Sequence, residues 1–383
     1  MVNTSLAGVI RAALESGRFR RVLGMLHGIE GLLADDLVDL AAQPASFLER
    51  LAQTPSAALG SCRYKLQPDD PERALEVLRR HEAGVFIYIG GNDSADTAHR
   101  VARAARTASY DLAVLGVPKT IDNDLPETDH CPGYGSAARF LALATRWVGA
   151  DTRAMRRTDP VRIIEVMGRH AGWLAAASAL GREQEGDAPH VVLVPERPLA
   201  LETILAAVQS AYRASGFAVV VLCENQPDET GAVLGARGGP RYVDPFGHAY
   251  YDSPGLYLAT QVQERLGLRA RYDKPGALQK TFMAAASSVD LEEAERCGRA
   301  AVELALGGHS DEMVILLRDD GPHYHCRTGA APLEVIANRQ KRLPEAFIRP
   351  DGLGPSAAFL DYARPLIGEP LPLLARLDPS ARA

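Results

Sequence analysis

Short apolar runs alternate with amphipathic stretches along most of this chain, and this alternation constrains the fold more than any other feature. The apolar runs have the length of buried strands, and the stretches between them carry apolar residues at helical spacing. The predicted strands cover residues 85–89, 112–117, 162–166, 190–194, 218–223 and 313–317. The predicted helices cover residues 5–15, 94–108, 136–148, 170–180, 201–214, 254–266 and 290–306. Strands that alternate with helices are typical of crossover units, so we predict an α/β protein with mainly parallel sheets.

Composition argues against several classes of protein. With 383 residues, of which 46% are hydrophobic, the chain is long enough for two or three domains. The net charge is −6 and no long basic run occurs, so we expect no nucleic-acid partner. The five cysteines form no CxxC pair, and no apolar run approaches the ~20 residues that span a bilayer. We therefore predict a cytoplasmic protein without a membrane segment.

The run PKTIDNDL, residues 118–125, follows one of the predicted strands and concentrates polar groups in a few positions. Open α/β sheets bind ligands at the carboxyl ends of their strands, where this run lies. Its side chains supply a cation, a hydroxyl and two carboxylates, which suit the handling of phosphate or of a metal ion. These groups belong to Lys119, Thr120, Asp122 and Asp124. The alternative is a solvated turn, because Asp and Asn are common turn residues.

A second candidate is YIGGNDS, residues 88–94, where a predicted strand meets a double glycine and the next helix is predicted to begin. Gly90 and Gly91 would allow a ligand to approach the backbone, and the amides that open the helix favour an anion. Asp93 would repel an extended polyphosphate, yet it could hold a hydrated cation or orient a compact phosphate ligand. An ordinary capped glycine turn explains the same residues.

Further segments carry groups that could bind a phosphorylated sugar. Arg63 follows a Gly-Ser turn, and an arginine can bind phosphate oxygens with two hydrogen bonds. Arg169 follows Gly168 after a predicted strand, and Glu224 lies at the end of another one. The segment RYDKPGALQK, residues 271–280, adds an arginine and two lysines. Each of these groups could also belong to an exposed loop, and it is their combination that favours a phosphate site.

In this order, GGNDS, PKTIDND, MGR and the strand before Glu224 resemble the phosphofructokinase family, and most closely its pyrophosphate-dependent branch. The resemblance extends over about residues 2–367. It implies two Rossmann-like three-layer α/β domains with mainly parallel sheets and an active site between them. The implied division is a phosphoryl-donor domain of residues 1–135 and about 284–330, a fructose 6-phosphate domain of residues 136–283 and about 331–366, and a C-terminal tail of residues 367–383.

Members of this family transfer a phosphoryl group to the 1-hydroxyl of fructose 6-phosphate with Mg²⁺, so the resemblance implies a role for each matching residue. The implied catalytic residues are Asp122 as general base, Lys119, Arg63 and Arg169. The implied substrate-binding residues are Thr120, Asp124, Met167, Gly168, Glu224, Arg271 and Lys280. The implied diphosphate-binding residues are Gly90, Gly91, Asn92, Asp93 and Ser94, and the implied magnesium ligands are Asp93 and Asp122. Arg271 could reach a neighbouring subunit's site, which implies a homodimer or a homotetramer.

Two positions predict the phosphoryl donor. ATP-using members of the family resemble GGDGS and have glycines where this chain has Asp93 and Lys119, which leaves room for a nucleotide. Here Asp93 crowds the region of the α-phosphate, while Lys119 can neutralise a compact pyrophosphate. The resemblance therefore implies reversible phosphoryl transfer between pyrophosphate and fructose 6-phosphate, a step of glycolysis and gluconeogenesis.

Several positions depart from the family pattern. Asn92 stands where ATP-using relatives have a metal-binding aspartate, Lys280 replaces an expected arginine, and Ala277 stands in place of a histidine. The family also has a strand and a glycine loop ahead of the first helix, whereas this sequence opens with a predicted helix, so both are expected to be missing. A start codon assigned too far downstream would explain this. Two alternatives stay open: a truncated, non-catalytic sugar-phosphate-binding or regulatory paralogue, and an ATP-dependent 6-phosphofructokinase.

Overall fold

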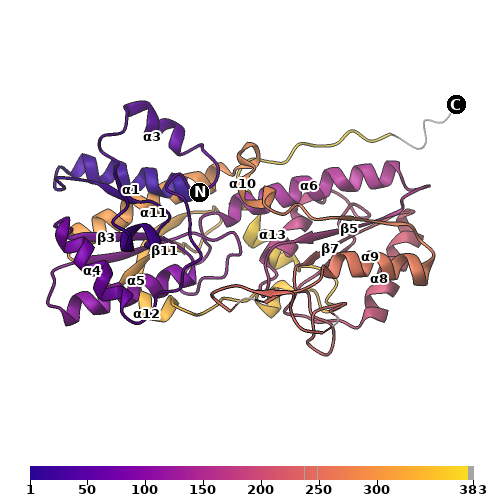
Figure 1. Ribbon diagram of the computed structural model, residues 1–383. Coiled ribbons are helices and arrows are strands. Elements are labelled where there is room, and N and C mark those ends of the chain that lie inside the picture. The colour runs from indigo at the N-terminus through magenta and orange to yellow at the C-terminus, as the bar shows by residue number, and fades with distance from the viewer. Residues whose placement is uncertain (237, 248, 378–383) are drawn as a thin grey trace.

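The structure is a computed structural model that describes residues 1–236, 238–247 and 249–377. Two α/β lobes lie side by side, and each contains a four-stranded sheet (Figure 1). The sheet of the first lobe has the order β12-β11-β4-β3. Its strands are β3 (Val85–Gly90), β4 (Ala113–Pro118), β11 (Glu312–Arg318) and β12 (Cys326–Pro332). Strands β3, β4 and β11 are parallel, and β12 is antiparallel to β11.

The sheet of the second lobe is parallel throughout and has the order β10-β5-β7-β6. Its strands are β5 (Val161–Val166), β6 (Val191–Leu193), β7 (Ala218–Cys223) and β10 (Ala270–Asp273). Every residue of β7 is buried, as its continuous apolar sequence predicts for a central parallel strand. The six strands predicted from the sequence are all present, and the α/β class with mainly parallel sheets is confirmed.

Helices cover both faces of the first sheet. On one face, α11 (Ser288–Leu306) packs Cys297 and Ala301 against Leu115 and Val314 of the strands. Helix α1 (Val2–Ser16) lies along the outer side of α11 (Figure 1). The other face is covered by α4 (Asp70–Arg80), α5 (Asn92–Thr107) and α12 (Leu333–Ile336). This lobe therefore has the three layers that the resemblance implies.

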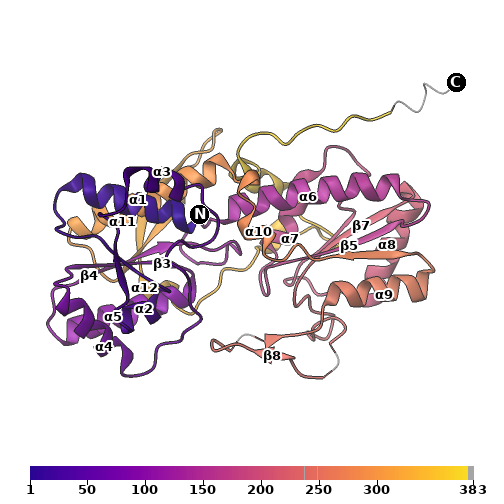
Figure 2. The ribbon, with the colours of Figure 1, turned by 45° about the horizontal axis from the view of Figure 1, so that its top comes forward.

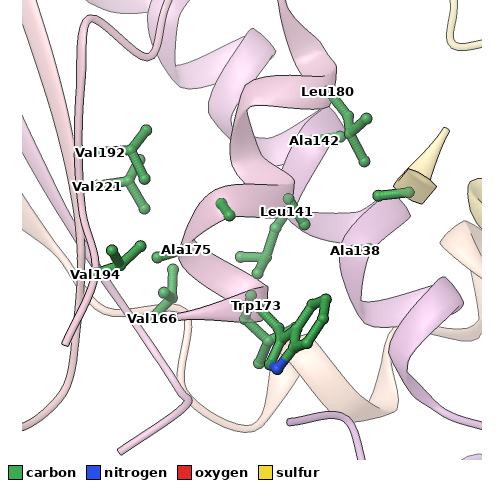
Figure 3. Packing of buried hydrophobic residues seen from close by; sticks show 14 of the residues in the cluster. Ala138, Leu141, Ala142, Val166, Trp173, Ala175, Leu180, Val192, Val194 and Val221 are labelled. Atoms are coloured by element: carbon green, nitrogen blue, oxygen red, sulfur yellow. The ribbon is translucent and has the colours of Figure 1, made fainter. Parts of the chain in front are cut away.

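The second lobe has the same layering. Leu141 of α6 (Tyr134–Ala154) and Ala175 of α7 (Trp173–Ala177) pack against Val166 and Val221 of the sheet (Figure 3). Alanines predominate in this interface, which lets the helices approach closely. The opposite face is covered by α8 (Leu201–Ser215) and α9 (Pro254–Leu266). Helix α13 (Ala357–Ala363) returns from late in the chain and packs beside α7.

Short elements complete the molecule. Those of the first lobe are β1 (Leu23–Met25), α2 (Ile29–Leu33), β2 (Leu37–Asp39) and α3 (Ala45–Leu51). Later in the chain come the hairpin of β8 (Tyr242–Val243) and β9 (Ala249–Tyr250), then α10 (Leu278–Thr281). Four 3-10 helices span Ser178–Gly181, Met283–Ala285, Glu345–Phe347 and Pro365–Ile367. Figure 2 shows the β8 hairpin extending from the second lobe toward the first.

Some predicted boundaries were wrong. The helix predicted over 170–180 begins only at Trp173, because Gly168 takes a positive φ of 103° and Gly172 caps the helix. Helix α5 begins at Asn92 rather than at 94, since Gly91 is its N-cap. In the segment 226–242, Pro227 and Val233 form an antiparallel β-bridge, and residue 237 lies outside the described residues.

The structure begins with helix α1, in agreement with the helix that the sequence predicts there. Within the described residues, β3 is an edge strand that pairs with β4 alone. After residue 367 the tail runs in an extended path, held by Arg139, Arg146 and Arg376, while residues 378–383 lie outside the described residues.

None of the described helices is long and apolar enough to cross a bilayer. The five cysteines are free. The domain boundaries near 135, 284 and 331 stay predictions.

Candidate active site

The two motifs of the first lobe lie next to each other because their strands are neighbours. Gly90 at the end of β3 is in register with Pro118 at the end of β4. The backbone amide of Lys119 donates to the Gly90 carbonyl at 3.0 Å. The glycine turn and the PKTIDND loop therefore open at the same edge of the sheet, where parallel sheets bind ligands.

The glycine turn presents the amino terminus of α5 at this edge. Gly91 is the N-cap, and Asn92, Asp93 and Ser94 form the first turn of the helix. A side chain at Gly90 would meet the Ser94 hydroxyl, since an added Cβ would lie 2.0 Å from its Oγ. The Asn92 amide oxygen accepts the backbone N–H of Asp93 at 2.9 Å. The turn combines the amino terminus of a helix with one carboxylate, an arrangement suited to a small phosphate ligand and a cation.

The loop after β4 turns sharply at Asn123, whose φ is 55°. The Thr120 hydroxyl accepts the backbone N–H of Asp122 at 3.1 Å. The Asp124 carbonyl accepts the backbone N–H of Lys341 at 2.6 Å, and its carboxylate accepts a longer bond of 3.3 Å from Gln340. The loop is thus held from both sides.

Asp122 is the most perturbed carboxylate of the site. Burial, together with the negative charges of Asp124 and Glu224, raises its pKa to about 7, against the opposing effect of Arg169 and Lys119. Its Oδ1 is buried and accepts no hydrogen bond from any of the described residues. A buried carboxylate oxygen without a partner, on a group that titrates near neutrality, is suited to accept a proton from a ligand.

Lys119 lies close to this carboxylate. Burial lowers the pKa of its ammonium group, and the positive charge of Lys280 adds to the effect, whereas Asp122 and Asp124 oppose it. A lysine in these surroundings can neutralise a compact anion that enters the site.

The second lobe contributes the ends of β5 and β7. The backbone N–H of Glu224 donates to the Val166 carbonyl at 2.8 Å, so Glu224 and Met167 leave neighbouring strands side by side. Gly168 has no room for a side chain, because an added Cβ would lie 2.7 Å from the carbonyl oxygen of Ala171. The pKa of Glu224 is raised by burial, which the charges of nearby cations oppose.

The two predicted phosphate-facing arginines come from different lobes and share a partner. Arg63 and Arg169 each donate to the Tyr250 hydroxyl at 2.9 Å. The Arg169 guanidinium also lies over the Tyr250 ring, 4.9 Å from its centroid. Arg63 forms an ion pair with buried Asp244 at 2.5 Å. Sequence reasoning missed Tyr250 and Asp244, because a hairpin with two-residue strands has no recognisable periodicity.

Two predicted residues lie apart from this group. Arg271 is opposite Arg162 in the register of β10 with β5, near the amino end of that strand, and its partner is Asp159 at 3.1 Å. The structure does not bring Arg271 to the edge where Glu224 lies, so its action in a neighbouring subunit's site stays a prediction. Lys280 lies in α10 and is exposed. Its positive charge contributes to the lowered pKa of Lys119.

Metal-binding capacity is modest in the described part of the chain, where no cluster of three or more His, Cys, Asp or Glu side chains could hold an ion. Mg²⁺ in phosphate-transferring sites takes one or two carboxylates and completes its shell with substrate phosphates and water. The carboxylates of Asp122 and Asp93, which follow neighbouring strands, fit this pattern. The site therefore suits a cation that arrives with a phosphate ligand.

The site combines a carboxylate that can accept a proton, carboxylates that can bind a cation, and arginines from both lobes. This combination is typical of sites that transfer phosphoryl groups. Residues 1–305 match the sequence profile of the family described as Phosphofructokinase, and the chain belongs to this family. The chain is 41% identical over 379 residues to a protein of Xanthomonas campestris named pyrophosphate–fructose 6-phosphate 1-phosphotransferase. The aligned region covers 97% of this chain and 90% of the relative.

Two further comparisons concern the donor and the fold. A protein of Amycolatopsis methanolica named ATP-dependent 6-phosphofructokinase is 32% identical over 367 residues, with 92% of this chain and 73% of the relative covered. The crystal structure of a pyrophosphate-dependent phosphofructokinase from Nitrosospira multiformis superposes with a TM-score of 0.88 at 38% identity, covering 96% of this chain and 89% of that one. The phosphofructokinase fold is thereby confirmed.

Proposed function

We propose that this protein transfers a phosphoryl group from pyrophosphate to the 1-hydroxyl of fructose 6-phosphate, and that it also catalyses the reverse reaction. The observation that carries the proposal is Asp122, whose pKa is raised to about 7 and whose buried Oδ1 lacks a partner among the described residues. The activity printed in the name of the Xanthomonas relative agrees with this chemistry.

Asp122 acts as the general base. When ionised, its unpartnered oxygen accepts the proton of the sugar hydroxyl as the hydroxyl oxygen attacks phosphorus. A pKa near neutrality lets the carboxylate hold this proton during transfer and release it afterwards. In the reverse reaction the protonated group returns the proton to the leaving sugar oxygen, so one residue serves both directions.

Cations from both lobes stabilise the charge on the transferring group. Arg63 comes from the first lobe and Arg169 from the second, and their guanidinium groups meet at the Tyr250 hydroxyl. Two guanidinium groups on one hydroxyl oxygen repel each other, which an anionic phosphoryl group placed between them would relieve. Phosphoryl transfer relies mainly on positioning and charge stabilisation, so both arginines are expected to be essential.

The donor is assigned to pyrophosphate because of Asp93 and Lys119. Asp93 lies in the first turn of α5, where its carboxylate opposes the long polyphosphate chain of a nucleotide. Lys119, beside the carboxyl end of β3, supplies a positive charge for the compact anion. Pyrophosphate carries its full charge within two phosphate groups and is therefore favoured by a single nearby cation.

Magnesium is the proposed cofactor, and Asp122 and Asp93 are the proposed protein ligands. The bound ion would screen the charge of pyrophosphate and draw electron density from the transferring phosphoryl group. Thr120, Asp124, Met167, Gly168 and Glu224 are proposed to line the sugar side. Arg271 of a neighbouring subunit is proposed to complete it within a homodimer or homotetramer.

An assay with two donors tests the proposal. The purified full chain is incubated with fructose 6-phosphate, MgCl₂ and either pyrophosphate or ATP, and fructose 1,6-bisphosphate is measured. We expect turnover with pyrophosphate, its loss in Asp122→Asn, and unchanged turnover in Asp111→Asn, an exposed carboxylate outside the site. Turnover with ATP and none with pyrophosphate would refute the donor assignment. Sugar-phosphate binding without turnover under either condition would favour the non-catalytic alternative.

A further inference from the structure

Asn123 sits at the centre of the catalytic loop and carries no proposed role in the chemistry. It is fully buried and adopts a left-handed backbone conformation, which asparagine tolerates better than most residues. Its side-chain oxygen accepts the backbone N–H of Cys131 at 3.0 Å, and its amide nitrogen donates to the Tyr362 hydroxyl at 3.2 Å. Since Asp122 and Asp124 flank it, the orientation of this residue contributes to where both carboxylates point, together with the bonds from Thr120 and Lys341.

The Tyr362 hydroxyl and the Cys131 N–H together determine which way the Asn123 amide faces. Its proton is donated to the carbonyl oxygen of Asp129 at 2.8 Å. A hydroxyl has one proton, so it can only accept from Asn123, and it therefore selects the NH₂ end of that amide. Tyr362 lies in α13, which belongs to the second lobe, so this bond ties the catalytic loop of one lobe to a helix of the other.

Asp129 in turn is held by a buried ionic network. His130 is 2% exposed and lies between two carboxylates, with Nδ1 2.8 Å from Asp129 and Nε2 2.6 Å from Glu293. Burial lowers the pKa of His130, but its hydrogen bonds to the two carboxylates outweigh this effect and raise the pKa, which favours a charged imidazole that donates from both nitrogens. Arg318 adds two bonds to the same oxygen of Asp129, at 3.0 and 3.1 Å. The carbonyl that receives the Tyr362 proton is thus part of a rigid unit.

We propose that Tyr362 is a positioning residue for the phosphoryl transfer, which acts through Asn123 to hold Asp122 against the substrate. The inference rests on the proposed function for its kinetic consequences but not for its structural ones. Loss of the hydroxyl leaves the buried Asn123 amide with an unpaired donor and with the Cys131 N–H as its remaining side-chain partner, so the turn is held less firmly. The charges that face Asp122, from Asp124, Glu224, Arg169 and Lys119, then act at altered distances.

Tyr362→Phe is the direct test, because the ring contacts with Trp173 and Phe359 remain and only the hydroxyl is removed. We expect kcat to fall about 10-fold or more, since small misplacements of a catalytic group carry costs of this order. The KM for fructose 6-phosphate is expected to stay within about twofold, because the proposed sugar contacts lie outside the Asn123 bond. The matched control is Tyr110→Phe, which removes a tyrosine hydroxyl bonded to the Ala83 carbonyl, away from the site.

A double-mutant cycle separates positioning from a general loss of stability. If Tyr362 acts through Asn123, Tyr362→Phe will lower kcat far less in an Asn123→Gly background, where glycine accepts the positive φ and the amide is absent. Equal fold-losses in both backgrounds, or a kcat within twofold of the wild type in Tyr362→Phe, would overturn the inference. So would a kcat loss of the same size in Tyr110→Phe.

A readout without turnover keeps this inference apart from the proposed function. Hydrogen exchange of the Cys131 backbone amide, which donates to the Asn123 side-chain oxygen, reports how firmly the loop is held whatever the donor is. We expect protection of this amide to fall in Tyr362→Phe and to persist in Tyr110→Phe. Unchanged protection in Tyr362→Phe would refute the positioning role, even if the wild type failed to use pyrophosphate. Conversely, a wild type inactive with pyrophosphate would refute only the proposed function.

Discussion

Replacing Asp122 by asparagine should abolish turnover and stabilise the fold. The pKa of Asp122 is raised from an ordinary value of 3.8 to about 7 by burial and by the neighbouring carboxylates. Between these two values the folded chain holds a proton that the unfolded chain releases, so wild-type stability falls as pH rises through this window. Above pH 7 the folded protein carries a buried charge that asparagine does not have.

The magnitude follows from the pKa difference. About three pH units, each worth about 1.4 kcal/mol, give an upper bound of about 4 kcal/mol for the gain at pH 8. Relaxation and water near the site reduce this cost, so we expect a gain of about 1–3 kcal/mol. At pH 5 most of the folded wild type is already protonated at Asp122, and the gain should shrink to about half or less of its value at pH 8.

Urea unfolding of the wild type and of Asp122→Asn at pH 5 and pH 8 measures this gain directly. Asp111→Asn is the control, because an exposed carboxylate should change stability little and equally at both pH values. An Asp122→Asn variant that is less stable than the wild type at pH 8 would refute the argument that burial of this carboxylate is costly. A gain that does not depend on pH would refute its attribution to Asp122 ionisation.

Three other changes test neighbouring parts of the site. Glu224→Gln removes a negative charge that raises the pKa of Asp122, so the acidic limb of the pH profile of kcat/KM should move to lower pH. A pH–rate profile that does not move would count against an electrostatic coupling between Glu224 and Asp122. Gly168→Ala should destabilise the fold by about 1–3 kcal/mol in urea unfolding, because φ is 103° and the new Cβ would press on a backbone carbonyl. Asp93→Gly combined with Lys119→Gly should lower kcat/KM for pyrophosphate by about 100-fold or more and admit ATP, while retained selectivity for pyrophosphate would contradict the donor argument.

The fold was predictable where the sequence is periodic. The six apolar strands and most of the long amphipathic helices were found because burial of one face, or of a whole strand, leaves a pattern in local sequence. Helix α4 (Asp70–Arg80) was missed. Strand β10 was missed, since its residues, Ala270 to Asp273, are mostly polar, and so was β12. The hairpin that carries Asp244 and Tyr250 was missed for a related reason, because its few residues bury no periodic face.

The candidate site was predictable in part. Lys119, Asp122 and the glycine turn follow buried strands that are predicted to be parallel, so their position at one sheet edge was expected. The meeting of Arg63 with Arg169 at Tyr250 was not, since the three residues come from distant segments of the chain. The position of Arg271 beside Asp159 depends on the register of β10, which has no signal in the sequence.

The sequence by itself determined the class of fold, the family and the groups that can do the chemistry, because these are properties of local pattern and residue type. The tertiary structure decided the state of those groups. Asp122 is an ordinary aspartate in the sequence, and its pKa near 7 arises from burial, from Asp124 in the same loop and from Glu224, a residue of the other lobe. Asn123 is an ordinary turn residue in the sequence, and only the fold brings it into hydrogen-bond contact with Tyr362. Electrostatic and hydrogen-bond effects depend on distance in space, which separation along the chain does not report.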